Sequence, residues 1–117
     1  MNQDASTPRQ FLSVTGQPID LDVLHEDQQR RRAKLQGELE RTDRYLADAI
    51  QRAELLDPDE PRTYSAGGLR VEVDEQIRSL RARRSHLVAE LAHVDEMLQE
   101  TGRRIRAFDR GREALDG

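Results

Sequence analysis

Two short clusters of cations are the residues of this chain best suited to bind a charged ligand. They comprise Arg30, Arg31, Arg32 and Lys34 in the first half of the chain and Arg103, Arg104 and Arg106 near its end. Clustered cations of this kind bind phosphate groups or acidic protein surfaces. The opposite interpretation is a solvated face on which the cations pair with nearby carboxylates such as Glu26 and Glu100. Phe108 is the only aromatic residue beside the clusters, so stacking on nucleic-acid bases is not favoured.

A second group with possible chemistry consists of His86, Glu90 and His93, which a helix would place on one side. The spacing of Glu90 and His93 is half of the Glu-x-x-His pattern of di-iron carboxylate sites. Such a site must project into a helical bundle, whereas Leu91 and Val94 occupy the apolar positions here. We therefore predict that both histidines are surface residues and that the chain holds no metal.

Residues for enzymatic chemistry are not evident. The chain has no cysteine, which removes thiol nucleophiles, disulfides and cysteine zinc sites. Gly67-Gly68 lacks the Lys and the Ser or Thr that follow in a phosphate-binding loop. We expect no catalytic residues, no cofactor and no enzymatic activity.

The composition points to the elements that must position these residues. The 117 residues are 36% charged, 35% apolar and only 3% aromatic, which predicts long helices with a narrow apolar seam rather than a thick globular core. The net charge of −4 argues against a non-specific coat on nucleic acid by the whole chain. No apolar run of membrane-spanning length occurs, and the polar Met1 to Arg9 segment lacks the apolar core of a secretory signal.

A first helix is predicted over about residues 21–56, with Asp20 or Asp22 as its cap. The sequence Asp57-Pro58-Asp59-Glu60-Pro61 ends it, because two prolines in four residues cannot continue a helix. Its apolar seam alternates in steps of four and three, the spacing of a coiled-coil heptad: Leu35, Leu39, Thr42, Leu46, Ala49, Ala53 and Leu56.

A second helix is predicted over about residues 74–110, with Asp74 as its cap and Gly111 as its stop. The same alternation of three and four runs along its whole length, through Ile77, Leu80, Arg84, Leu87, Leu91, Val94, Leu98, Thr101, Ile105 and Phe108.

The connector, about residues 62–73, is predicted to form a small β-hairpin. Its second half alternates apolar and polar residues, and Gly67-Gly68 suits a tight turn. Leu69, Val71 and Val73 then share one packed face. The predicted fold is mainly α: a long antiparallel helical hairpin (coiled coil) with a small β-hairpin between the helices.

A register follows if Leu56 faces Ile77. Arg84 then faces Ala49, and Arg32 faces Thr101, so a long arginine lies opposite a small residue each time. The same register brings both cation clusters to one end of the hairpin. We call the seven residues of the opening paragraph the basic tip.

The domain organisation is a flexible or docking arm over residues 1–19 and a helical hairpin domain over residues 20–117. The apolar piece of the arm is Phe11-Leu12-Ser13-Val14. Since two helices bury only one stripe each, we expect self-association or docking on a larger partner.

The segment Thr63-Tyr64-Ser65-Ala66-Gly67-Gly68-Leu69-Arg70-Val71, followed by the helix from Asp74, resembles the gpW-like head-to-tail joining proteins of tailed phages. The likeness covers about residues 45–98. That family has a helix, a small β-hairpin with a glycine turn, and a second antiparallel helix.

This resemblance implies a structural protein of the virion neck, with copies that ring the portal exit, retain packaged DNA and join head to tail. The partner-binding residues would be Phe11, Leu12, Tyr64, Leu69, Val71 and Val73. The basic tip would meet a portal surface or, non-specifically, DNA. Further copies, portal proteins and tail-side proteins are the implied partners, and no membrane is involved.

Two other functions remain open. A cytoplasmic coiled-coil adaptor would complete its seam with a second hairpin, as a dimer or four-helix bundle. A small regulator would bind another protein through Phe11 to Val14.

Overall fold

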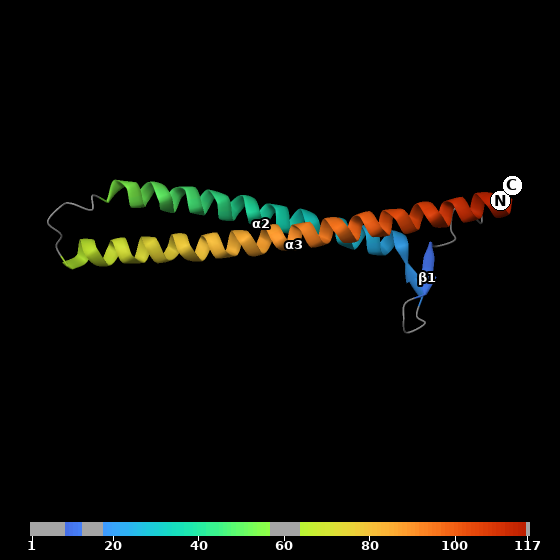
Figure 1. Cartoon of the computed structure of the whole chain (residues 1–117), viewed down its shortest axis with the longest axis horizontal. Helices are drawn as coiled ribbons and strands as arrows, with labels where there is room; N and C mark the ends of the chain where they lie inside the picture. Colours follow the sequence, from blue (N-terminus) through green and yellow to red (C-terminus); the bar gives the residue numbers. More distant parts are fainter. Residues whose placement is uncertain (1–8, 13–17, 57–63, 117) are drawn as a thin grey trace. The chain divides into compact units, whose positions relative to one another are not determined.

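Two long helices make up most of the chain (Figure 1). The computed structural model describes residues 9–12, 18–56 and 64–116. Helix α2 spans Leu21–Leu55 and helix α3 spans Tyr64–Asp116. Two short strands precede them, β1 at Gln10–Leu12 and β2 at Pro18–Asp20.

The chain forms two compact units, and each contains a segment of both helices. The terminal unit comprises Met1–Ala33 and Ala92–Gly117, and the central unit comprises Lys34–Leu91. Within each unit, the α2 and α3 segments lie side by side and run in opposite directions (Figure 1). The predicted class, a mainly α protein built as an antiparallel helical hairpin, is confirmed.

The core of the central unit is a narrow apolar seam at heptad spacing. Leu87 is only 3% exposed and Ala49 is fully buried, while most of the intervening polar positions are exposed. This pattern confirms the heptad interpretation, because positions seven residues apart share one side of a helix. The buried residues of the seam are Leu35, Thr42, Ala49, Ala53, Val73, Leu87 and Leu91.

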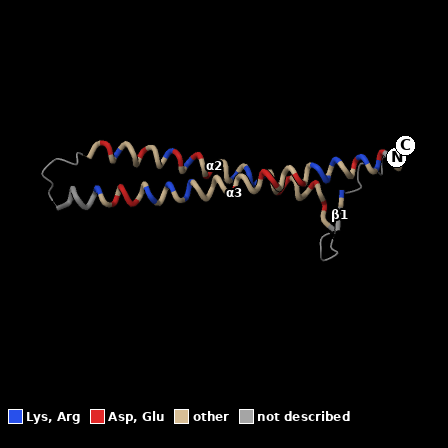
Figure 2. Tube along the Cα trace, in the orientation of Figure 1, with Lys and Arg blue, Asp and Glu red and all other residues tan. Residues whose placement is uncertain are grey.

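Ion pairs and hydrogen bonds across the helices flank this seam. Arg84 Nε donates to Asp43 Oδ1 at 2.7 Å, and Arg52 donates to Gln76 Oε1 at 3.0 Å. Figure 2 shows how cations and carboxylates intersperse along both helices. These exposed contacts help to orient the two helices relative to each other within the unit. They add little to the free energy of unfolding, because solvent screens such pairs.

The β-hairpin predicted at residues 62–73 is wrong over residues 64–73, which belong to α3; residues 62 and 63 lie outside the described residues. Val73 is 5% exposed whereas Val71 is 57% exposed. A strand would turn both side chains to one face, but a helix turns them to opposite sides. The heptad seam continues to Val73, and its burial outweighs the local preference of the glycine pair for a turn.

The boundaries predicted for the second helix are therefore also wrong. Asp74 is not a cap, because it lies inside α3 and pairs with Arg70 one turn earlier, at 3.4 Å. Gly111 does not stop the helix, which continues to Asp116. A single glycine costs a helix about 1 kcal/mol without breaking it.

In the terminal unit, a two-stranded antiparallel sheet leads into α2. β1 pairs with β2 so that Phe11 lies opposite Ile19. The core of this unit contains Leu21 and Val94, which are 1% and 0% exposed. A hydrogen bond between buried side chains crosses it, from the Thr101 hydroxyl to Gln28 Oε1 at 2.8 Å.

The predicted register is wrong by about one helical turn. Thr101 contacts Gln28 instead of facing Arg32, which reaches Asp95 Oδ1 at 2.6 Å. In the central unit, Arg84 pairs with Asp43 rather than lying over Ala49. The physical reason is that each arginine gains a carboxylate in this register, and the buried glutamine gains a hydroxyl partner.

Candidate binding surface of the terminal unit

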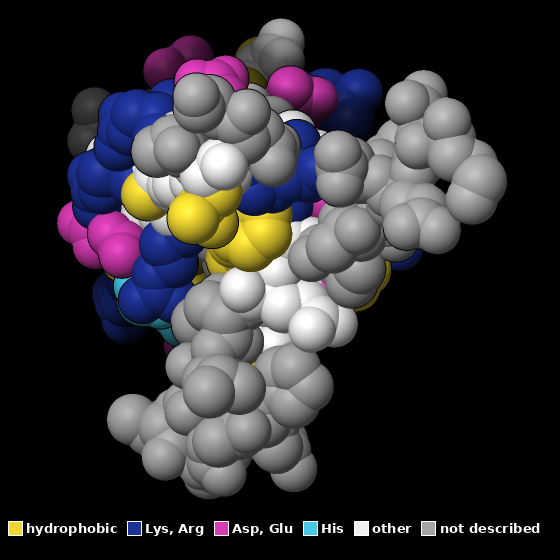
Figure 3. All heavy atoms as spheres, turned by 90° about the vertical axis from the view of Figure 1, so that its right-hand side faces the viewer, with side chains coloured by type: hydrophobic (Ala, Val, Ile, Leu, Met, Phe, Trp, Pro, Cys, Tyr) yellow, Lys and Arg dark blue, Asp and Glu magenta, His cyan; other side chains and the backbone are white. Residues whose placement is uncertain are grey.

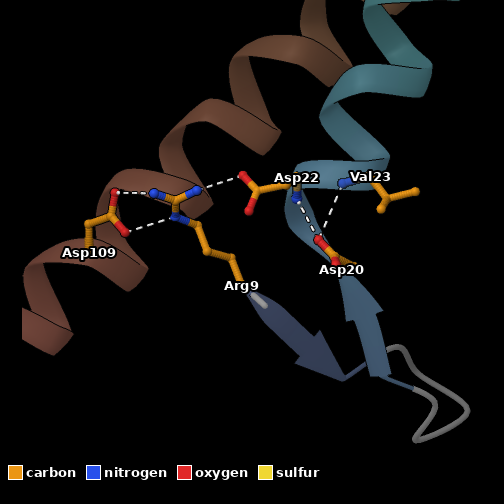
Figure 4. A network of polar contacts seen from close by, with 5 residues as sticks. All are labelled: Arg9, Asp20, Asp22, Val23 and Asp109. Carbon is orange, nitrogen blue, oxygen red and sulfur yellow. Dashed lines mark hydrogen bonds and ion pairs between the residues drawn. The ribbon is translucent and has the colours of Figure 1, made fainter. Parts of the chain in front are cut away.

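Arg9 connects the N-terminal segment to both helices of the terminal unit (Figure 4). Its guanidinium group donates to both oxygens of Asp109 on α3, at 2.9 and 3.4 Å. The remaining terminal nitrogen donates to Asp22 Oδ1 on α2 at 2.6 Å. A planar guanidinium can hold two carboxylates in this way because its donors form a fixed fork. One side chain therefore ties the strands to the start of α2 and the end of α3.

The start of α2 holds Asp22 in place for this contact. Asp20 caps the helix, since its carboxylate accepts hydrogen bonds from the backbone N–H groups of Asp22 at 2.9 Å and Val23 at 3.3 Å. The backbone N–H of Leu21 also donates to the carbonyl of Arg9. Of the two caps that the sequence offers, Asp20 is the one used.

Two groups in this unit have pKa values that depart from their ordinary range. Hydrogen bonds to Asp109 first, and then to Asp22, raise the pKa of Arg9. The hydrogen bond from Arg103, helped by the charges of Arg103 and Arg104, lowers the pKa of Glu100 from its ordinary value of 4.5. Both shifts favour the charged forms.

The basic tip is divided by the structure. Six of its residues belong to the terminal unit, whereas Lys34 belongs to the central unit. All seven are exposed. Much of the charge is locally balanced, as the solvated-face interpretation expects: Arg30 pairs with Glu26 at 2.6 Å, and Arg103 and Arg104 share Glu100 at 2.6 and 3.1 Å.

One part of the surface keeps an excess of arginine. Arg103, Arg104, Arg106 and Arg110 surround Ala107 in a shallow depression on α3. In Figure 2 cations recur along this last part of α3, and Figure 3 shows basic side chains along one side of the terminal end, interrupted by acidic ones. Among the described residues, Arg106 and Arg110 have no ion pair.

The apolar residues predicted to bind partners do not form one surface. Phe11 and Leu12 lie in β1 and Tyr64 and Leu69 in α3, but their side chains lie outside the described part of the chain. Val71 is exposed, and Val73 is part of the buried seam and unavailable to a partner.

The histidine group does not form a metal site among the residues that the structure describes, where no set of three potential ligands converges. The exposed His86 places its Nε2 2.6 Å from Oε1 of the half-buried Glu90, one turn further along α3. Neither α2 nor α3, as far as each is described, is apolar enough to cross a membrane.

Sequence reasoning missed Arg9 and Gln28. Arg9 follows no periodic pattern, and its partner Asp109 lies 100 positions away. Gln28, in contrast, lies one heptad before Leu35, so extending the seam backwards would have found it.

Comparisons of this chain with known protein families, with curated proteins and with solved structures give no match.

Proposed function

We propose that this chain is a non-enzymatic coiled-coil adaptor whose helical hairpin pairs with a second copy to form a four-helix bundle. The observation that carries the proposal is the thin core. Among the side chains that the structure describes, eight apolar ones are buried, and two of these are alanines. Such a seam offsets little of the entropy lost when two long helices become ordered.

A groove on one side of the central unit is the part of the surface that a second copy fits best. Its apolar lining includes Ile50, Leu56 and Ile77, all only half-buried. Burying these side chains against the same groove of another copy would widen the core from one stripe to a bundle interior.

The rim of the groove is suited to a copy of itself. It carries both signs of charge, with Arg78 and Arg81 on one part and Glu54 on another. In a two-fold interface, residue i of one copy contacts residue j of the other and residue j contacts residue i, so a rim with both signs can pair across the axis. A strongly acidic or basic partner would meet like charge at one of the two parts.

Sedimentation of the full chain from about 1 to 100 μM tests this function. We expect a concentration-dependent dimer. Ile50→Glu should shift the chain to monomer, whereas Leu55→Glu, five positions further on and 78% exposed, should leave the dimer intact. Circular dichroism of both variants checks that helicity is kept. A monomer at every concentration, or equal loss in the two variants, would refute the proposal.

The head-to-tail joining function, which the phage resemblance implies, stays a second proposal. It is supported by the antiparallel helices, while the segment expected to form its glycine turn is helical from residue 64 onward. A chain of that function would stay monomeric alone and form rings only on a portal template. The two proposals therefore predict opposite results in the same sedimentation experiment.

A further inference from the structure

We propose that the outward side of α3 between Arg103 and Arg110 binds the phosphate backbone of a nucleic-acid duplex, independently of the dimer proposed above. Within residues 103–112 there are five arginines and one aspartate. Without that segment the chain has 14 basic and 22 acidic residues, a net of −8. This short stretch is therefore strongly positive, while the remainder of the chain is acidic in net charge.

The helix sets the arginines in a line. Arg103, Arg106 and Arg110 follow at i, i+3 and i+7, so they share one side of α3 around Ala107. At 1.5 Å per residue they span about 10 Å along the helix axis. One strand of a duplex presents a phosphate about every 3.4 Å along its axis, so this span matches about three phosphate steps.

Two neighbouring carboxylates, Asp109 and Glu100, leave this side available. Asp109 lies three positions after Arg106, the spacing of an ordinary helical ion pair. Both of its oxygens are instead taken by Arg9, at 2.9 and 3.4 Å. The N-terminal segment thereby keeps Asp109 from neutralising Arg106. Glu100 pairs with Arg103, whose side chain still remains 62% exposed.

The chemistry of this side favours phosphate over the other anionic surfaces. Most of the energy of a protein interface comes from buried apolar or aromatic anchors, and a helix that lies in a membrane surface buries an apolar face there. Ala107 is the one apolar side chain lining the depression. Guanidinium groups bind phosphate through paired hydrogen bonds, and contacts of this type carry no base specificity.

Fluorescence anisotropy with a labelled mixed-sequence 20-base-pair DNA duplex tests the proposal on the full chain. We expect weak binding at low salt, with a slope of log K against log salt near −3, as three neutralised phosphates require. The triple substitution R103Q/R106Q/R110Q should weaken binding about tenfold or more and flatten that slope.

The matched control is R41Q/R44Q/R83Q, which removes three exposed arginines of the central unit and changes the net charge equally. We expect it to change binding less than threefold. No binding at 20 mM salt would overturn the proposal, as would equal losses in the two triple variants. Tighter binding to polyglutamate or to phosphatidylserine vesicles than to the duplex would overturn it too, by assigning this side to an acidic protein or a membrane.

Discussion

At the scale of single residues, the polar contacts decide how the helices are matched. Gln28 and Thr101 are 9% and 3% exposed and hydrogen-bond to each other inside the core of the terminal unit. A polar pair of this kind stabilises little, but any shift of the helices would leave both groups buried without a partner. We interpret the pair as the feature that sets the register of the terminal unit.

A double-mutant cycle tests this interpretation. Thr101→Val alone should lower the free energy of unfolding by about 1–3 kcal/mol, because Gln28 Oε1 loses its donor. Adding Gln28→Leu should restore most of that loss, since two apolar groups can pack together. Urea unfolding of the native chain, the two single variants and the double variant measures the coupling between the two side chains. Independent, additive effects would contradict the assigned hydrogen bond.

Glu100 should make stability depend on pH. Its pKa is lowered in the folded chain, mainly by Arg103. A lowered pKa means that this contribution is present above the unfolded value of 4.5 and is lost as pH falls through the lower folded value. The melting temperature of the native chain should therefore fall more steeply below pH 4.5 than that of Glu100→Gln.

The expected difference is small, because the groups are exposed and solvent screens them. Repeating the titration in 1 M salt should bring the two curves together. Curves that differ by the same amount at pH 7 and pH 3 would show that the substitution acts through packing and not through the charge.

At the scale of elements, substitutions near the beginning of α3 can test whether this segment is a helix or a strand. Val73→Ala should lower the free energy of unfolding by about 1–3 kcal/mol, since Val73 is buried in the seam. Val71→Ala removes the same atoms from a side chain that is 57% exposed and should change it by less than about 0.5 kcal/mol. Chemical denaturation measures the free energy of unfolding of both variants. Equal losses would support the strand that the alternating sequence suggests.

The two helices and their seam could be predicted from the sequence because a heptad is a local, repeated signal. Leu35, Ala49 and Leu87 hold the positions that the spacing predicts. The register of one helix against the other could not be predicted from the sequence, because neighbouring registers all place apolar residues opposite one another. Only polar pairs such as Gln28–Thr101 distinguish among these registers. The prediction for the connector was wrong because Leu69, Val71 and Val73 match a strand pattern, while Val73 also continues the heptad of the helix that follows.

The candidate binding surface was predicted only in part. Arginine clusters are visible in the sequence, and six members of the basic tip do lie in one unit. Which arginines remain unpaired depends on contacts between distant segments, above all the capture of Asp109 by Arg9. A single sequence carries no signal for such a pair.

At the scale of the whole molecule, the thin core leads us to expect that stability depends on association. If a second copy completes the bundle, mass action stabilises the folded dimer as concentration rises. We expect the melting temperature to increase between about 1 and 100 μM protein, and Ile50→Glu to abolish that increase. A melting temperature independent of concentration would favour a chain that folds alone.

The Arg9–Asp109 contact has a consequence for chain topology. The side chains of Arg9 and Asp109 touch although they are 100 positions apart. Joining the backbone near these two residues into a ring would therefore need only a short added peptide link. Backbone cyclisation would then reduce the conformational entropy of the unfolded chain and leave the cores of the central and terminal units unchanged. A cyclised chain should melt at a higher temperature than its linear form, and its helices should unfold as one closed loop with no free ends from which to fray.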